Sequence, residues 1–254
     1  QTSDALAIYG GFVGGAEREA VTKHLIHDVE VEHDSHLSTG IIGTRYLFDV
    51  LCDVGRPDLA YAVVNQSSYP GYGYMIREGA TTLWERWELL TGEAMNSHNH
   101  IMFGSVDSWF YRYIAGIRAD ESEPGFSHIV FKPEVLLLDH VSASLMTLKG
   151  KVSIEWQRQG NTLNVKVHVP VGSRATVQLP KGQLLIEEKE VGGELPQGVH
   201  GISETEGQIN VEIYSGDYAF TYPCQKRRDF LSWHKAFYLT LADFSGMKCP
   251  NRHF

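Results

Sequence analysis

The chain has 254 residues, 43% of them hydrophobic and 21% charged, which suffices for one large or two ordinary folded domains. Its formal net charge is -9, and the sequence has no long run of lysine and arginine that could bind the phosphates of a nucleic acid. Nucleic acid is therefore not an expected partner. No apolar stretch reaches the roughly 20 residues that cross a bilayer, and the first residues lack the pattern of a signal peptide. We expect a soluble protein without a membrane partner, and its compartment, cytoplasmic, secreted or periplasmic, stays open.

The first part of the chain predicts helices, since apolar side chains recur there every three or four residues. One helix is expected over 15–29. A second is capped by Ser38 or Thr39 and stops near Gly55, and a third opens at 56–58 with a proline in its first turn. These predict an antiparallel helical array.

Farther along, residues 69–74 predict a loop, because proline and glycine break helices there while three tyrosines supply rings. A short helix is expected from Thr81 or Thr82 through Trp87, and a longer one over 105–117, where apolar side chains again recur every three or four residues.

The second half changes to a period of two, which predicts antiparallel strands packed as a sandwich. The apolar residues that alternate with polar ones are Val152, Ile154, Trp156, Leu163, Val165, Val167, Val169, Ala175, Val177, Leu179, Ile209, Val211 and Ile213. We place the domain boundary near 121–125 and interpret the glycine-rich stretch 182–207 as a surface excursion between strands. The predicted domains are therefore 1–120, 121–222 and a tail, 223–254, of unknown role.

Cysteines and histidines give no sign of a metal site. Cys52, Cys224 and Cys249 lack metal-ligand spacing, and reduced thiols are expected. The histidines between residues 24 and 36 are interpreted as surface or capping residues, so no metal and no cofactor is predicted.

The stretch 79–88, GATTLWERWE, raises the question of a site, because sugar-binding sites combine aromatic rings with charged hydrogen-bonding groups. On a helix Glu85 and Glu88 project to neighbouring sides, as do Trp84 and Trp87, so at most one glutamate points at a ligand. Taken alone, the stretch favours two core rings, one paired glutamate and one solvated glutamate. Tyrosines near residue 70, and His98, Asn99 and His100, place more rings and polar groups within about thirty residues.

Several motifs, in this order, resemble bacterial-type alpha-L-rhamnosidases, glycoside hydrolase family 78. They are HLSTGIIGTRYLFDVLCDVGRPDLAYAVVNQSSYPGYGYMIREGATTLWERWE at 36–88, the pair Asn99-His100, GSVDSWFYRYIAGI at 104–117, PGFSHIVFKPE at 124–134 and VPVGSRATVQLP at 169–180. The resemblance implies the C-terminal portion of an (alpha/alpha)6 barrel followed by an antiparallel beta-sandwich. It also implies hydrolysis, with inversion, of terminal alpha-L-rhamnose in rhamnosides or rhamnose-containing polysaccharides.

The resemblance also implies roles for single residues. Glu85 is the catalytic base that activates water, and His100, beside Asn99, contacts the sugar. Trp84 forms a wall or support of the site, and Tyr72 stacks on the sugar where the family commonly has a tryptophan. Glu88 is interpreted as structural.

One part of the family's site is missing from this sequence. The family's general acid lies upstream in a D-x-x-x-R-x-E motif, which does not occur in residues 1–78. The five or so predicted helices also fall short of a six-hairpin barrel, so the expected partner is an upstream part of that barrel. Two alternatives stay open: a catalytically incomplete carbohydrate-binding or interaction module, and a similar barrel that acts on another sugar.

Overall fold

The computed structural model describes residues 1–92, 96–136, 138–190, 195–205 and 207–223. Within them the contacts divide the chain after Ser108 into a helical unit and a sandwich unit. The predicted tail lies outside the described residues except for Pro223, as do Cys224 and Cys249, and Cys52 is a buried thiol. None of the described helices is long and apolar enough to cross a bilayer.

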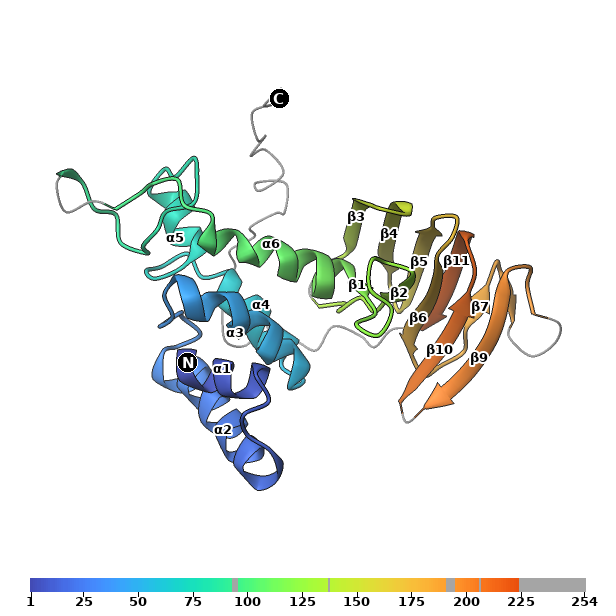
Figure 1. Cartoon of the computed structure of the whole chain (residues 1–254), viewed down its shortest axis with the longest axis horizontal. Coiled ribbons are helices and arrows are strands. Elements are labelled where there is room, and N and C mark those ends of the chain that lie inside the picture. The colour runs from blue at the N-terminus through green and yellow to red at the C-terminus, as the bar shows by residue number, and fades with distance from the viewer. Residues whose placement is uncertain (93–95, 137, 191–194, 206, 224–254) are drawn as a thin grey trace. The chain divides into compact units, whose positions relative to one another are not determined.

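The helical unit contains α1 to α5 and most of α6 (Figure 1). The helices are α1 (Thr2–Tyr9), α2 (Gly15–His27), α3 (Ile41–Asp53), α4 (Pro57–Val64), α5 (Tyr72–Arg77) and α6 (Ser105–Trp109). A π-helical turn, Asp28–Glu32, extends α2. The core of the helical unit forms where α3 packs between α1 and α4, and Leu47, Phe48 and Leu51 of α3 are buried. The predicted helices near 15, 41 and 57 are confirmed, whereas α1 was not predicted.

The first correction concerns the start of α3. The residue that caps α3 is Gly40, and no side chain caps the helix. The predicted caps Ser38 and Thr39 are therefore wrong. The Thr39 hydroxyl instead shares a hydrogen bond of 2.7 Å with the hydroxyl of Thr44, inside the helix.

The second correction concerns the loop before the WERW stretch. The predicted loop at 69–74 ends sooner than expected, because α5 begins at Tyr72 directly after its N-terminal cap, Gly71.

The third correction is that residues 81–87 form no helix. In a helix each backbone N–H bonds a carbonyl four residues earlier, but here the Glu85 N–H bonds the Ser97 carbonyl at 2.9 Å. The His100 N–H bonds the Leu83 carbonyl, also at 2.9 Å. Residues 82–88 are thus paired with 96–100 rather than with themselves.

The last predicted helix ends earlier than expected. α6 continues as a π-helical turn, Phe110–Ala115, and Gly116 ends it with φ at 85°, a value that favours glycine. A side chain at Gly116 would meet backbone atoms of Lys132 and Pro133, and Ile117 already belongs to a strand. The Trp156 indole donates to the Ile114 carbonyl at 3.0 Å, which fastens this turn to β4 (Gly150–Gln159) within the sandwich unit.

The sandwich unit consists of two sheets (Figure 1). One has the order β1-β2-β6-β10-β9 and the other the order β3-β4-β5-β11-β7-β8. The strands are β1 (Ile117–Ala119), β2 (His128–Phe131), β3 (His140–Thr147), β4 (Gly150–Gln159), β5 (Thr162–Val169), β6 (Arg174–Pro180), β7 (Leu185–Ile186), β8 (Lys189–Glu190), β9 (Val199–Thr205), β10 (Gln208–Ile213) and β11 (Gly216–Pro223).

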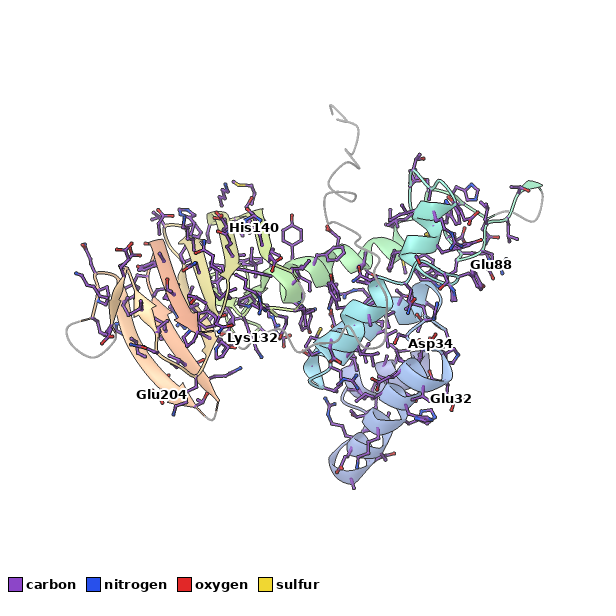
Figure 2. All side chains as sticks on the ribbon, turned by 180° about the vertical axis from the view of Figure 1, so that it is seen from behind. Glu32, Asp34, Glu88, Lys132, His140 and Glu204 are labelled. Carbon is purple, nitrogen blue, oxygen red and sulfur yellow. The ribbon has the colours of Figure 1, made fainter. Side chains whose placement is uncertain are left out.

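The predicted fold class, helices followed by a sandwich, is confirmed. All thirteen apolar residues of the predicted period-two pattern are buried. Neighbouring strands also carry exposed polar residues, such as His140 on β3 and Glu204 on β9 (Figure 2). Two details differ from the prediction. β2 pairs with β6 in parallel, and the stretch 182–207 contains β7, β8 and β9 rather than a plain excursion.

Candidate functional site

The candidate site is built on the pairing of segment 82–88 with segment 96–100 in the helical unit. Besides the two backbone bonds described above, the Thr82 hydroxyl donates to the His98 carbonyl. The Asn99 N–H bonds the Ser97 hydroxyl at 3.0 Å, which turns the second segment toward His100. The pairing brings Trp84, Glu85, Asn99 and His100 close together from two segments.

Glu85 is half-exposed, and its carboxyl group is held by the opposite segment. Its Oε2 atom accepts the Ser97 N–H at 3.0 Å, and the Asn96 side chain hydrogen-bonds to the same carboxyl group. These two bonds, and then the nearby His100 and Arg86, lower the pKa of Glu85, since each favours the carboxylate over the acid. Glu85 is therefore an ionised acceptor at neutral pH, which is the state that a general base requires.

His100 is half-buried, and its ring is oriented by the backbone. Its Nδ1 atom accepts the Met102 N–H at 3.3 Å. A neutral imidazole carries one hydrogen, so this bond places the hydrogen on Nε2. The ring can then donate from Nε2 to a hydroxyl oxygen. The neighbouring Asn99 is exposed.

The two tryptophans of the stretch are both buried. Trp87 stacks on Phe103 with ring centroids 3.9 Å apart, and its indole donates to the Thr39 carbonyl at 2.7 Å. Trp84 lies against the His98 ring, with the two ring centroids 5.1 Å apart. Trp87 is thus a core residue, whereas Trp84 supports the segment that carries Asn99 and His100.

Tyr72 is placed differently from its predicted role. Only 1% of its surface is exposed, its hydroxyl donates to the Phe103 carbonyl at 2.8 Å, and burial raises its pKa. Stacking on a sugar stays a prediction that this burial does not favour. Tyr69 is instead the exposed ring of the loop, held edge-on by Tyr74 at 5.4 Å.

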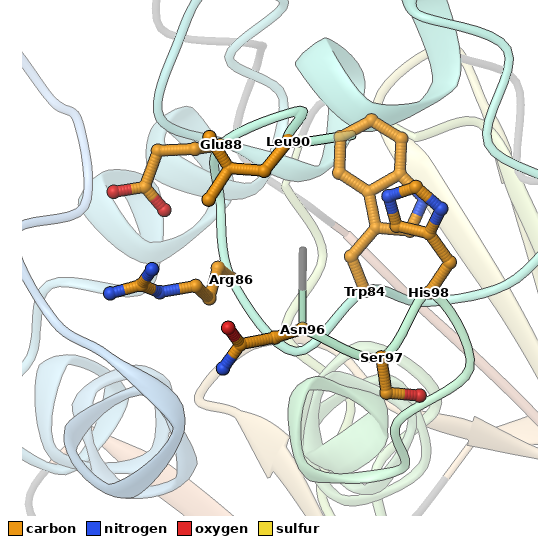
Figure 3. Close-up of a pocket in the computed structure, with 7 residues that line it drawn as sticks. All are labelled: Trp84, Arg86, Glu88, Leu90, Asn96, Ser97 and His98. Carbon is orange, nitrogen blue, oxygen red and sulfur yellow. The ribbon is translucent and has the colours of Figure 1, made fainter. Parts of the chain in front are cut away.

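A shallow, open hollow adjoins Glu85, since Asn96 and Ser97 line it. Figure 3 shows the Trp84 and His98 rings on one side and the Arg86 and Glu88 side chains on the other. Glu88 is exposed at the surface, as expected for a solvated residue (Figure 2). It also hydrogen-bonds to Tyr69, whose pKa is raised by burial and then by this carboxylate.

Sequence reasoning missed Asn96 and Ser97, which hold the Glu85 carboxyl group. Nothing in their spacing indicates this, because they lie eleven and twelve residues after Glu85 in the sequence. In the part of the chain that the structure describes, no group of three or more His, Cys, Asp and Glu residues could hold a metal ion.

Two family models match the chain. The bacterial alpha-L-rhamnosidase six-hairpin glycosidase domain matches residues 1–114, and the bacterial alpha-L-rhamnosidase C-terminal domain matches residues 116–194.

Similar proteins carry the same description. An alpha-L-rhamnosidase of Streptomyces avermitilis is 33% identical over 233 residues, which cover 87% of this chain and 21% of that protein. An alpha-L-rhamnosidase of Alteromonas sp. (strain LOR) is 37% identical over 144 residues, 54% of this chain and 15% of that protein.

Solved structures agree. The alpha-L-rhamnosidase from Dictyoglumus thermophilum superposes with a TM-score of 0.80 at 44% identity, covering 87% of this chain and 25% of that one. The structure of the Streptomyces avermitilis alpha-L-rhamnosidase complexed with L-rhamnose superposes with a TM-score of 0.77 at 30% identity. The match covers 87% of this chain and 21% of that one. The matched part of the chain thus spans 15–25% of the length of these relatives.

Proposed function

The chain belongs to the bacterial alpha-L-rhamnosidases through its two matched domains, and we propose that it supplies the general-base half of an inverting rhamnosidase site. The substrate is a glycoside or polysaccharide with terminal alpha-L-rhamnose. The observation that carries the proposal is the ionised Glu85 carboxyl group, held by Ser97 and Asn96 on the segment that also presents His100.

The proposed reaction is a single displacement. Glu85 takes a proton from a water molecule whose oxygen attacks the anomeric carbon, while the bond to the leaving-group oxygen breaks. A second carboxylic acid protonates that leaving oxygen, and the two carboxyl groups of inverting enzymes stand about 6.5–9.5 Å apart. The His100 Nε2–H donates to a sugar hydroxyl, with the Asn99 amide beside it and Trp84 behind the segment.

We further propose that the acid and the rest of the barrel come from an upstream segment. The D-x-x-x-R-x-E motif does not occur in residues 1–78, and the Streptomyces avermitilis and Dictyoglumus thermophilum relatives are about four to five times as long as the segment that aligns. The proposed domain limits are 1–120 for the barrel hairpins and 121–222 for the sandwich, with 223–254 as a tail. A catalytically incomplete binding module is not favoured, since the similar proteins reported above are alpha-L-rhamnosidases.

A domain exchange tests the proposal. The segment of the Dictyoglumus thermophilum relative that aligns with this chain is replaced by the chain itself, and both the chimera and the 254-residue chain are assayed on a chromogenic alpha-L-rhamnoside. We expect hydrolysis by the chimera and none by the chain alone. Hydrolysis by the chain alone would refute the divided site, and a folded but inactive chimera would refute the function.

The choice of sugar is tested separately. The chimera is offered matched chromogenic rhamnosides, fucosides and glucosides. The rhamnoside is expected to give the highest kcat/KM. A preference for another sugar would contradict the proposed substrate but would leave the proposed barrel fold unaffected.

A further inference from the structure

The carboxyl group of Glu85 is surrounded on one side by groups of a single turn, Asn96-Ser97. The Ser97 N–H reaches Oε2 at 3.0 Å, and the Asn96 side chain bonds the same carboxyl group. The charged or titratable groups that also act on it are His100 and Arg86, and their effect on the carboxyl group is weaker than that of the two hydrogen bonds. The Asn96-Ser97 turn is thus the main contact of this half-exposed side chain.

The backbone makes this contact reciprocal. Glu85 donates its own N–H to the Ser97 carbonyl at 2.9 Å and accepts the Ser97 N–H on its side chain. Both ends of Glu85 are therefore fastened to one residue. A partly exposed glutamate otherwise samples several rotamers, and ordering such a side chain costs conformational entropy.

The same turn also directs the second candidate residue. The Ser97 hydroxyl accepts the Asn99 N–H at 3.0 Å, and the His100 N–H then bonds the Leu83 carbonyl at 2.9 Å. The groups that donate to the Glu85 carboxyl group and the ring of His100 thus lie on one short segment, at most four residues apart.

We propose that Asn96 is a positioning residue, which with the Ser97 N–H on Oε2 holds the Glu85 carboxyl group in one orientation toward the attacking water. This inference rests on the proposed function of Glu85. The holding donors make the carboxylate a weaker base but keep it ionised and aimed, and correct orientation of a catalytic group is a large part of its effect.

The test is a carboxyl-carbon NMR titration of the 254-residue chain labelled at glutamate. The Glu85 signal is the one that disappears in Glu85→Gln. In Asn96→Ala we expect the pKa of Glu85 to shift upward, toward its ordinary value, because a donor to the carboxylate is lost. Asn96→Asp should shift it further, because a like charge replaces the donor. Asn96→Gln, which keeps the amide, should restore a lower pKa than Asn96→Ala.

The matched controls are Asn99→Ala and Asn99→Asp. They make the same chemical changes three residues away, on an exposed side chain that is not among the groups acting on Glu85. The Asn99 variants should shift the pKa of Glu85 clearly less than the corresponding Asn96 variants do. Equal titrations for wild type and Asn96→Ala, or equal shifts at the two positions, would overturn the proposal.

Failure of this proposal is distinguishable from failure of the proposed function. The titration reads the Glu85 carboxyl group whether or not any rhamnoside is hydrolysed. If Asn96→Ala displaces the Ser97 amide signal and so disturbs the turn, the comparison of Asn96→Asp with wild type still decides, because aspartate and asparagine have nearly the same shape.

Discussion

The helical unit and the sandwich unit differ in where they expose large apolar side chains. In the sandwich, Leu148 and Val171 lie in turns, and Met146, near the end of β3, is the one large apolar side chain of the described strands that is mostly exposed. In the helical unit, Ile42 lies on α3 with 61% of its surface exposed, and Val31 lies on the π-helical turn with 60% exposed. Phe12 and Ile101 are still more exposed. Apolar side chains on the face of an element commonly mark a contact with another segment. The sandwich buries its alternating strand residues by itself, and the exposed apolar side chains on helices of the helical unit fit the proposal of an upstream barrel partner.

The largest expected effect is on the core of the sandwich. Trp156 is fully buried and donates to the Ile114 carbonyl. Trp156→Ala should lower the free energy of unfolding of the sandwich by about 3–5 kcal/mol, because it leaves a cavity. Trp156→Phe, which loses mainly the hydrogen bond, should cost less.

Urea unfolding, followed through amide signals of each unit by NMR, measures both variants. The signals of residues 1–92 should keep their midpoint in Trp156→Ala. A common shift of both sets of signals would break the distinction between two separately stable units.

Gly116 provides the next test, at the start of the sandwich unit. Its φ is 85°, and an added Cβ would clash with the backbone of Lys132 and the Pro133 nitrogen. Gly116→Ala should destabilise the sandwich by about 2–4 kcal/mol, from left-handed strain plus the clash. Gly160→Ala is the matched control, since Gly160 has φ at 62° and open space around its Cβ position. Equal losses of thermal stability in the two variants would show that the clash is unimportant.

A smaller effect tests the exposed apolar face of the helical unit. In the 254-residue chain, Ile42→Gln should change stability by less than about 0.5 kcal/mol, as surface substitutions usually do. In the chimera the same change should cost about 1–2 kcal/mol if the upstream barrel covers Ile42. Leu148→Gln, at a hairpin tip, should be neutral in both proteins. A neutral Ile42→Gln in the chimera would count against the barrel partner at this face.

The smallest effect concerns the pH dependence of the sandwich. Hydrogen bonds from the Ser122 hydroxyl and N–H, and then from His128, lower the pKa of Asp120 to about 2. A lowered pKa means that the carboxylate adds stability above its ordinary pKa of 3.8, and that this stability is lost as pH falls toward 2. Asp120→Asn should therefore be less stable than wild type at neutral pH, with a difference that shrinks between about pH 4 and pH 2. Thermal unfolding of both proteins over this pH range measures the difference. A stability difference that does not change with pH would contradict the lowered pKa of Asp120 as its cause.

The two units also differ in how far the sequence predicted them. The alternation in β4, β5, β6 and β10 is local, so it predicted both the strands and their buried faces. The parallel pairing of β2 with β6 joins residues more than forty positions apart, and no local period indicates it. β11 does carry an alternating signal in Tyr218, Phe220 and Tyr222, which the prediction overlooked.

In the helical unit, local spacing misled the prediction at the candidate site. Trp84 and Trp87 stand at helical spacing, yet their segment bonds to residues 96–100 instead of forming a helix. The motif drew attention to Glu85, but a long-range pairing determines its hydrogen bonds. Asn96 and Ser97 could therefore be found only in the structure.

The most direct test of the proposed site compares two glutamates of the WERWE stretch in the chimera. Glu85→Gln should lower kcat on a chromogenic alpha-L-rhamnoside by about 10²–10⁴-fold, the usual effect of a positioned general base, with the fold unchanged. Glu88→Gln, on the exposed carboxyl group beside Tyr69, should retain most of the activity. Near-normal turnover in Glu85→Gln, or an equal loss in both variants, would contradict the assignment of Glu85 as the base.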